Sequence, residues 1–232
     1  MDACFQQEGI EFSFAGNTGE TTSHYQSDSA WMINLPGPPN YNISMPAKLP
    51  GTRCYTDASI CPDTSPQVPR RAGTGIFIVT SYAGIISTIY VKAICQECNS
   101  VLMAEATALA LRAKILNAMQ VPQPFFLSYN QQLVNFLNGK NHSNPPIWEI
   151  KPYTQSFVNI ISTNGGKIFK IARKLNITAH VLANQAYNCS ITQIHDHRAT
   201  CTNPTHSDSC QYLTAINFVM GDSFTLIAAS CR

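Results

Sequence analysis

The order of extended and helical segments constrains this chain more than any other feature of its sequence. Three strand-like runs follow one another with short links, at 53–59, 72–79 and 85–94. Such runs predict consecutive antiparallel strands. An apolar stripe with helical spacing comes next, and strands and helices then alternate as far as about residue 186. A strand meander continued by helix–strand units predicts a mixed α/β sheet with helices on its faces.

The boundaries of these elements follow from capping, turn and small residues. Ser100 is expected to cap a helix whose apolar stripe includes Leu102 and Leu116. Gly73 and Gly75, in the second strand, are expected to permit close approach of another backbone. The further elements expected are a strand at 124–128, a helix at 131–137, a helix reaching about 161, a strand at 167–171 and a helix at 176–186.

The composition changes on both sides of this central region. Residues 1–48 are rich in Gly, Pro, Ser and Asn, which predicts a flexible N-terminal extension with one apolar patch at Trp31. The domain is expected to span 49–190, followed by a Cys/His-containing extension at 191–232. The closing stretch, 218–231, is expected to add an edge strand or to dock on the core. Hydrophobic residues make up 44% of the 232, which is enough for a packed core.

Charge and cysteine content bear on the partners and the compartment. The net charge of +2 is too small to indicate nucleic-acid binding on its own. No apolar run reaches the ~20 residues of a transmembrane helix, and the first residues lack the basic and apolar regions of a secretory signal. The nine cysteines are therefore interpreted as reduced thiols of an intracellular protein, nuclear or cytoplasmic, with no membrane partner.

Five short motifs occur in order along the predicted elements. They are YTDAS at 55–59, AGTGI at 72–76, MAEATAL at 103–109, SYNQQLV at 128–134 and NITAHVLANQA at 176–186. Together they resemble the ribonuclease H-like domain of plant retroelement reverse transcriptases and of plant proteins derived from them. The resemblance runs from Cys54 to Ala186, more than half of the chain. It implies a mixed five-stranded sheet flanked by helices and metal-dependent hydrolysis of the RNA strand of an RNA–DNA hybrid. The N- and C-terminal extensions outside the resemblance are expected to be flexible.

The resemblance also implies a site of four acidic groups around two Mg²⁺ ions. Asp57 matches the acid of the first strand and Glu105 matches the acid of the first helix, and these two are the expected catalytic residues and metal ligands. The family pattern Ser-Asp-Xaa-Gln-Xaa-Leu-Val carries Tyr129 at its acidic position here. His180 occupies the fourth position, where plant members carry either Asp or His.

Charge arithmetic predicts that this site has degenerated. Two Mg²⁺ ions bring four positive charges, whereas Asp57 and Glu105 supply two negative ones. Tyr129 is neutral near pH 7, and an imidazole such as His180 suits Zn or Mn better than Mg. We therefore expect weak binding of Mg²⁺ or Mn²⁺, if any, and weak or no cleavage. Asn130 would offer an amide oxygen to the site only if its strand slipped by one residue, and that slip would reverse every side chain.

Three functions are consistent with the sequence. The favoured one is a ribonuclease H-like domain that binds an RNA–DNA hybrid or another nucleic acid without efficient cleavage. The first alternative is an active metal-dependent RNA–DNA hybrid endoribonuclease, and the second is a non-catalytic module that binds a protein partner through the sheet edge and Trp31. The basic side chains expected to contact nucleic acid, or else to form a solvated edge, are Lys167, Lys170, Arg173 and Lys174.

Residues of the types that bind zinc gather near the C-terminus. They are Cys189, His195, His197, Cys201, His206 and Cys210. They contain no Cys-X-X-Cys pair and no zinc-finger spacing, since the only such pair, Cys95 and Cys98, lies far upstream. The sequence therefore favours a loop with incidental Cys and His over a structural zinc site.

Overall fold

The computed structural model describes residues 51–60, 71–82, 85–139, 142, 144–188, 198–204, 206, 210–220 and 224–232. All of them belong to one compact unit, Pro38–Arg232. The extension expected at 1–48, including Trp31, lies outside the described residues. The six described cysteines carry free thiols.

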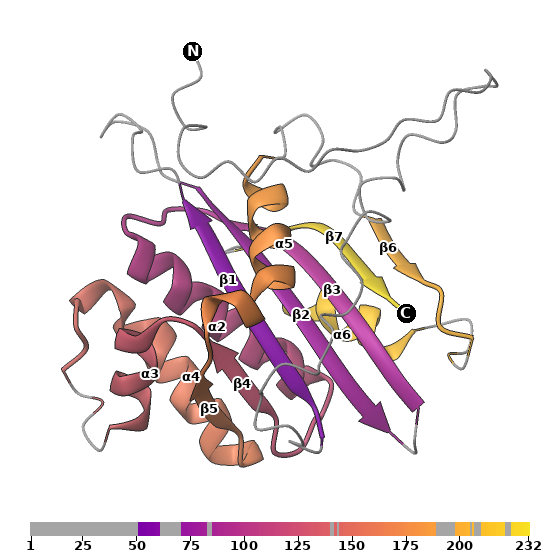
Figure 1. Cartoon of the computed structure of the whole chain (residues 1–232), viewed down its shortest axis with the longest axis horizontal. Helices are drawn as coiled ribbons and strands as arrows, with labels where there is room; N and C mark the ends of the chain where they lie inside the picture. Colours follow the sequence, from indigo (N-terminus) through magenta and orange to yellow (C-terminus); the bar gives the residue numbers. More distant parts are fainter. Residues whose placement is uncertain are drawn as a thin grey trace. The chain divides into compact units, whose positions relative to one another are not determined.

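The described residues form one mixed sheet in the strand order β5-β4-β1-β2-β3-β7-β6 (Figure 1). The meander is confirmed: β1 (Arg53–Ile60), β2 (Ala72–Tyr82) and β3 (Ile85–Cys95) pair antiparallel. On one side, β4 (Phe125–Ser128) runs parallel to β1, and β5 (Lys167–Lys170) runs parallel to β4. These five strands are the ones that the sequence predicts.

Two further strands extend the sheet on the other side, so that it has seven strands where the sequence predicts five. β7 (Phe224–Cys231) pairs antiparallel with β3, and β6 (Arg198–Cys201) pairs parallel with β7. The helix α6 (Gln211–Val219) lies between them in the chain. The apolar side chains of β7 are buried and cover an edge of β3 that would otherwise expose unpaired backbone groups. Residues within the predicted C-terminal extension thus form part of the sheet.

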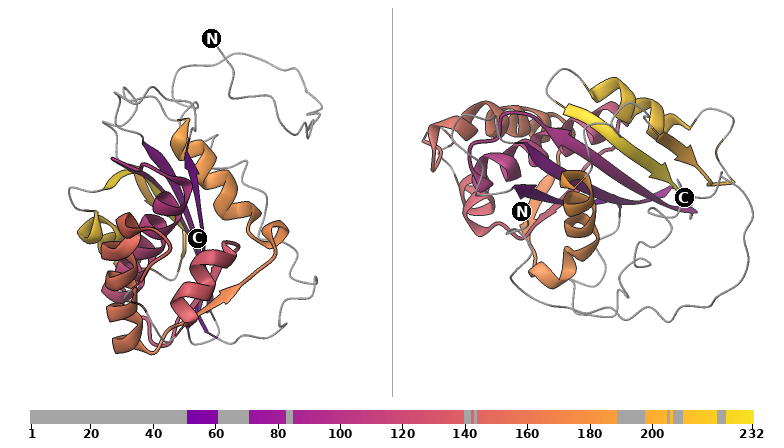
Figure 2. Two further views of the ribbon diagram at one scale, coloured as in Figure 1. Left: turned by 90° about the vertical axis from the view of Figure 1, so that its left-hand side faces the viewer. Right: turned by 90° about the horizontal axis from the view of Figure 1, so that it is seen from above.

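The helices cover both faces of the sheet. α2 (Val101–Ala118) packs on one face against β1 and β2, with α4 (Lys151–Asn164) and α6 packed against it. α5 (Ile177–Tyr187) packs against β1, β2 and β3 on the opposite face (Figure 2). Three short elements complete the description: α3 (Gln131–Asn138), a 3-10 turn at Trp148–Ile150 and another at Arg173–Leu175. No helix among the described residues is long and apolar enough to cross a membrane.

The predicted helix boundaries have direct physical causes. The Ser100 hydroxyl accepts a hydrogen bond from the Met103 amide at 3.1 Å, which confirms the predicted N-cap of α2. Gly165 ends α4 in the left-handed conformation, with φ of 71°. Ser100 supplies a hydrogen-bond acceptor at the start of α2, and Gly165 supplies the left-handed backbone conformation at the end of α4.

The two glycines of β2 permit the close approach of another backbone that the sequence predicts, and that backbone is α5. A Cβ on Gly75 would lie 2.1 Å from the Ala179 carbonyl oxygen, and a Cβ on Gly73 would lie 2.2 Å from that of Ala183. Both obstacles are backbone atoms of α5, which a rotamer change cannot move. The helix therefore rests directly on the strand, and this contact fixes where the α5 side chains meet the sheet.

Candidate functional site

Asp57 lies where two neighbouring strands separate. β1 pairs with β4 only over Arg53–Tyr55, so Asp57 stands two residues beyond the last paired position. It is directly opposite Gly75 across the β1–β2 ladder, and opposite residues of antiparallel strands share a face. Asp57 therefore points toward α5, and its side chain is 1% exposed.

The Asp57 carboxylate already has protein partners for both oxygens. Oδ1 accepts the Ala58 backbone amide at 2.8 Å, and Oδ2 lies 2.7 Å from Nδ1 of His180. The other ring nitrogen of His180, Nε2, lies 3.2 Å from the Asn184 amide nitrogen. With the Asn184 amide donating, His180 carries its proton on Nδ1 and donates it to Asp57. The structure thus brings together two of the predicted site residues, His180 and Asp57, through one hydrogen bond.

A side chain at the start of α5 secures this arrangement. The Asn176 amide nitrogen donates to the Thr56 carbonyl oxygen at 2.8 Å, and Asn176 is buried. This bond ties the first turn of α5 to the residue that precedes Asp57. Together with the glycine contact it positions His180 over the carboxylate.

Glu105 approaches the same point from α2 and is 2% exposed. Burial raises the pKa of Glu105 to about 8, with further contributions in the same direction from the charge of Asp57 and a hydrogen bond to it. A hydrogen bond from Tyr129 and the charge of Arg112 oppose that rise in pKa. Among the described residues, Oε1 of Glu105 has no hydrogen-bond partner. Near neutral pH this carboxyl group is mostly protonated.

Tyr129 directly follows β4 and lies beside both acids. Burial raises the pKa of Tyr129, and the charges of Glu105 and Asp57 raise it further, so its hydroxyl stays protonated. The guanidinium of Arg173 lies 5.8 Å from the centre of the Tyr129 ring. The aromatic ring therefore links the two acids to the basic segment that follows β5.

Asn130 does not take the place of the missing acid. Its Oδ1 accepts the Leu133 amide at 3.0 Å and so caps α3. Within β4, Leu127 pairs with Tyr55, and the strand register places Tyr129 on the side of the acids. The slip that would bring Asn130 into the site is absent from these residues.

Arg112, which the sequence analysis did not single out, joins the two strands that carry the site. This fully buried side chain lies two turns after Glu105 on α2. Its Nη1 donates to the Leu127 carbonyl at 2.8 Å and to the Cys54 carbonyl at 3.3 Å, and so joins β4 to β1. Its guanidinium also lies 5.1 Å from the centre of the Phe126 ring. The spacing of two helical turns between Glu105 and Arg112 is visible in the sequence. Helix periodicity alone, however, does not distinguish a buried arginine from an exposed one.

The four basic residues predicted to contact nucleic acid are all exposed. Lys167 and Lys170 lie on β5, the edge strand, and Arg173 and Lys174 lie in the turn that leads to α5. Through the contact of Arg173 with Tyr129 this basic edge continues to the acid pocket, by which we mean Asp57, Glu105, Tyr129 and His180.

The C-terminal Cys and His residues divide into two groups. Cys189, His195 and His197 lie outside the described residues. Cys201, His206 and Cys210 converge with a fourth residue, Cys231, and the four possible ligand atoms all lie within 4.8 Å of one another. The sequence did not single out Cys231, because it sits in an apolar strand far along the chain from the other three.

Comparison with known proteins supports the fold. No protein-family model matches this sequence, and no curated protein matches it either. Solved structures do match: ribonuclease H1 of the archaeon Halobacterium salinarum has 19% identity over 58% of this chain and 96% of its own, with a TM-score of 0.47. A prototype foamy virus protease–reverse transcriptase mutant has 17% identity over 66% of this chain, with a TM-score of 0.51.

A further neighbour is the foamy viral protease–reverse transcriptase in complex with an RNA/DNA hybrid, at 16% identity over 63% of this chain, with a TM-score of 0.48. This chain spans only 22% of the length of either foamy virus protein. At such identities the likeness concerns the fold alone. The fold is α/β and ribonuclease H-like, with a mixed sheet flanked by helices, as the sequence predicts.

Proposed function

We propose that this chain is a ribonuclease H-like nucleic-acid-binding domain, related to RNA–DNA hybrid ribonucleases, whose two-metal position has degenerated. The observation that carries the proposal is the state of Asp57. Its carboxylate, which would bridge two metal ions in an intact site, is held by His180 at 2.7 Å and by the Ala58 amide at 2.8 Å. We expect the domain to bind an RNA–DNA hybrid or another nucleic acid and to cleave it weakly or not at all.

The donor set does not fit a pair of Mg²⁺ ions. Mg²⁺ prefers oxygen ligands in octahedral geometry, and two such ions need several carboxylates to offset their mutual repulsion. Only Asp57 and Glu105 carry carboxylates, and burial raises the pKa of Glu105 to about 8, so a cation must displace a proton from it near neutral pH. Tyr129 contributes a neutral hydroxyl, and both ring nitrogens of His180 are engaged. The proton on Glu105 and the hydrogen bond that His180 donates to Asp57 balance the negative charge of these carboxylates, which metal ions would balance in an intact site.

Nucleic-acid binding is supported by the basic edge, defined as Lys167, Lys170, Arg173 and Lys174. All four side chains are exposed, and Arg173 lies against the ring of Tyr129. Lysine and arginine contacts to phosphates provide sequence-independent affinity that falls with salt. The foamy viral neighbour was solved with an RNA/DNA hybrid, which makes a hybrid the first ligand to test.

The experiment measures cleavage and binding of one labelled RNA–DNA hybrid. Native protein, Asp57→Asn, Tyr129→Asp and Tyr129→Phe are each incubated with Mg²⁺ and with Mn²⁺. We expect no metal-dependent cleavage by native protein, and hybrid binding that weakens steeply with salt. Tyr129→Phe controls for loss of the hydroxyl, whereas Tyr129→Asp restores a carboxylate. Efficient cleavage by native protein that Asp57→Asn abolishes would overturn the proposal.

One observation favours the first alternative, an active metal-dependent hybrid endoribonuclease. Oε1 of Glu105 is buried and has no hydrogen-bond partner among the described residues, so an oxygen ligand remains available to one divalent cation, Mg²⁺ or Mn²⁺. In that case cleavage appears in the same assay, and Glu105→Gln abolishes it. If neither cleavage nor binding is seen, the remaining proposal is a module that binds a protein partner.

The proposed lineage and compartment follow from the sequence motifs. We propose descent from a plant retroelement ribonuclease H-like domain, because five motifs occur in family order between Cys54 and Ala186. The free thiols of the six described cysteines are compatible with the proposed nuclear or cytoplasmic location. Imaging of the tagged full-length chain in plant cells tests this, and its accumulation in a secretory compartment would exclude it.

A further inference from the structure

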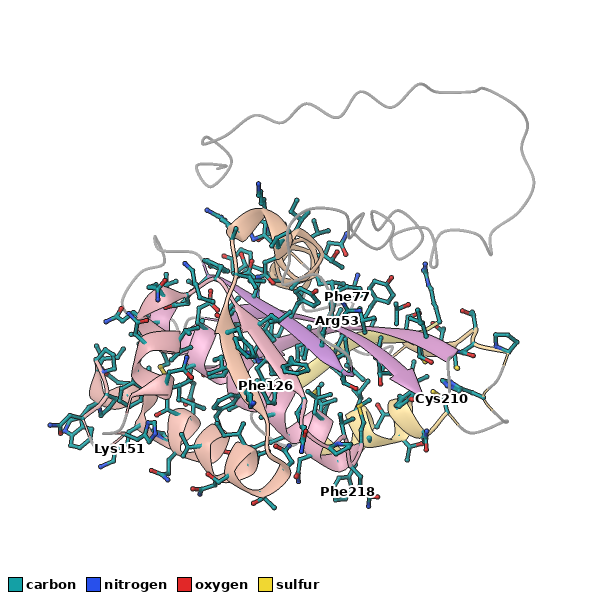
Figure 3. All side chains as sticks on the ribbon, turned by 60° about the horizontal axis from the view of Figure 1, so that its bottom comes forward. Arg53, Phe77, Phe126, Lys151, Cys210 and Phe218 are labelled. Carbon is teal, nitrogen blue, oxygen red and sulfur yellow. The ribbon has the colours of Figure 1, made fainter. Side chains whose placement is uncertain are left out.

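Four side chains from three elements meet at the β6–β7 edge of the sheet. Cys201 ends β6, Cys231 ends β7, and Cys210 immediately precedes α6, where Figure 3 labels it. His206 lies in the segment between Cys201 and Cys210. We call these four residues the Cys₃His cluster. It lies outside the acid pocket, and the proposed function makes no use of it.

The distances within the Cys₃His cluster are those of ligands around one ion. Nδ1 of His206 lies 3.2 Å from Sγ of Cys201, 3.4 Å from Sγ of Cys210 and 3.5 Å from Sγ of Cys231. A tetrahedral zinc ion has Zn–S bonds of about 2.3 Å and Zn–N bonds of about 2.0–2.1 Å, which place its sulfur and nitrogen ligands about 3.5 Å apart. The three measured separations agree with that edge length.

Hydrogen bonding by the His206 ring does not by itself account for this convergence. A neutral imidazole Nδ1 either donates one proton or offers one lone pair, so it cannot serve three thiols at once. The three sulfurs also form no disulfide, since Cys201, Cys210 and Cys231 are all free thiols. One shared cation would bind all four of these ligand atoms at once, which a single hydrogen bond from the imidazole does not do.

We propose that Cys201, His206, Cys210 and Cys231 bind one structural Zn²⁺ ion. Three thiolates and one imidazole form a four-ligand set of the Cys₃His type, which closes the coordination shell and leaves no open position for catalysis. Soft thiolate ligands in tetrahedral geometry select zinc over Mg²⁺, Ca²⁺ or Mn²⁺. The site is assembled by the fold, because Cys201 and Cys231 are paired neighbours on the parallel strands β6 and β7.

The contacts around the cluster indicate what the ion stabilises. The Thr202 amide donates to the Cys231 carbonyl at 2.9 Å, which continues the β6–β7 pairing past Cys201. Residue 232 exchanges backbone hydrogen bonds of 2.9 Å with Thr88 of β3, and the Asn203 side chain donates to the Ser87 hydroxyl at 3.0 Å. The His206 ring also packs edge-on against Tyr212 of α6, with centroids 5.1 Å apart. A zinc ion here joins β6, α6 and β7 to one another and, through these bonds, to the central sheet.

The test uses the full chain, prepared with reduced thiols and then loaded with Zn²⁺ or Co²⁺. We expect about one zinc per chain by elemental analysis, and a visible Co²⁺ spectrum of the kind that tetrahedral thiolate ligation produces. Cys201→Ser and His206→Ala each remove one ligand. Loss of an outer-shell partner typically costs 10–100-fold in metal affinity, so we expect loss of a ligand to cost at least about a hundredfold in competition with a chelator.

Two matched variants separate the cluster from other Cys and His residues. Cys98→Ala removes a buried thiol, and His142→Ala removes a ring that packs on Phe136; neither residue belongs to the Cys₃His cluster. Both should retain one zinc. Should Cys201→Ser or His206→Ala fail to fold, the Co²⁺ spectrum of the native chain decides by itself. Absence of thiolate ligation in that spectrum, less than about 0.2 equivalents of zinc, or a disulfide within the cluster under reducing conditions would overturn the proposal.

Discussion

The acid pocket and the Cys₃His cluster lie in different parts of the same sheet and differ in how their polar groups are satisfied. In the acid pocket each charge already has a proton or a hydrogen-bond donor: His180 on Asp57, and a retained proton on Glu105. In the Cys₃His cluster three thiols surround one ring nitrogen, which can form a hydrogen bond with only one of them at a time. The acid pocket thus leaves one buried atom without a partner among the described residues, Oε1 of Glu105, whereas the Cys₃His cluster presents four convergent ligand atoms to a single ion.

The two regions also differ in what holds them in place. His180 reaches Asp57 because α5 rests on β2 through Gly73 and Gly75, a contact between backbones. The Cys₃His cluster is held by the pairing of β6 with β7, by the packing of α6 through Cys210 and Tyr212, and by the proposed ion. Changes that affect one region should therefore leave the other intact.

The largest effect is expected from Gly75→Ala. The added Cβ would meet backbone atoms of α5 at 2.1 and 2.4 Å, so the helix must move and the contact of His180 with Asp57 is lost. Overpacking typically costs 1–3 kcal/mol, and with backbone on the opposing side we expect a loss of at least about 3 kcal/mol in the free energy of unfolding. Urea denaturation of native protein and Gly75→Ala measures this loss in the free energy of unfolding.

Gly139→Ala is the matched control for that variant. Gly139 has an ordinary φ of −70°, and an added Cβ would lie no closer than 3.2 Å to its neighbours. We expect a change below about 1 kcal/mol. If Gly139→Ala loses as much free energy of unfolding as Gly75→Ala does, the backbone contact between α5 and β2 does not explain the loss.

The sequence motifs predicted the four residues of the acid pocket as a site, and the strand position of Gly73 and Gly75 predicted a close backbone contact, but neither predicted which side chains would meet. The hydrogen bond from His180 to Asp57 joins residues 123 positions apart, and it depends on how deeply α5 docks. Cys231 joins Cys201 because β6 and β7 pair in parallel, and register is a tertiary property. Local patterns predict elements and their caps, whereas the convergence of distant side chains requires the topology.

A second prediction tests whether a proton has replaced the metal at Glu105. Its pKa is raised from 4.5 to about 8 in the folded protein. Between these values the folded state binds more protons than the unfolded state, so the free energy of unfolding falls as the pH rises from about 4.5 to about 8. Glu105→Gln removes this dependence. We expect Glu105→Gln to be more stable than native protein at pH 9 by a few kcal/mol, given about 1.4 kcal/mol per pKa unit.

Thermal or urea unfolding across this pH range measures the difference between native protein and Glu105→Gln. Glu149→Gln is the matched control, because Glu149 is exposed on the 3-10 turn before α4. Its pH profile should run parallel to that of the native protein. A native profile that is already parallel to that of Glu105→Gln would mean that Glu105 is ionised when folded, which would favour a cation in the acid pocket.

A third prediction concerns the basic edge. Lys170→Ala and Lys174→Ala should each weaken hybrid binding and reduce the slope of log K against log salt by about 1, because each removes one phosphate contact. Fluorescence anisotropy of the labelled hybrid at several salt concentrations measures both quantities. Lys114→Ala, an exposed lysine on α2, is the control and should bind as native protein does. Unchanged slopes for all three variants would exclude the basic edge as the binding surface.

The smallest effect is expected from Asn130→Asp, which places a carboxylate beside Tyr129 without altering the fold. Asp caps a helix as well as Asn does, so Oδ1 should still accept the Leu133 amide and the free energy of unfolding should change by less than about 0.5 kcal/mol. Because this side chain is directed at the start of α3 and not at Glu105, we expect no gain of hybrid cleavage with Mn²⁺. Tyr129→Asp adds the same charge one residue earlier, inside the acid pocket. If Asn130→Asp cleaves the hybrid as well as Tyr129→Asp does, the position of the carboxylate is unimportant and the assignment of Tyr129 to the lost acidic position is wrong.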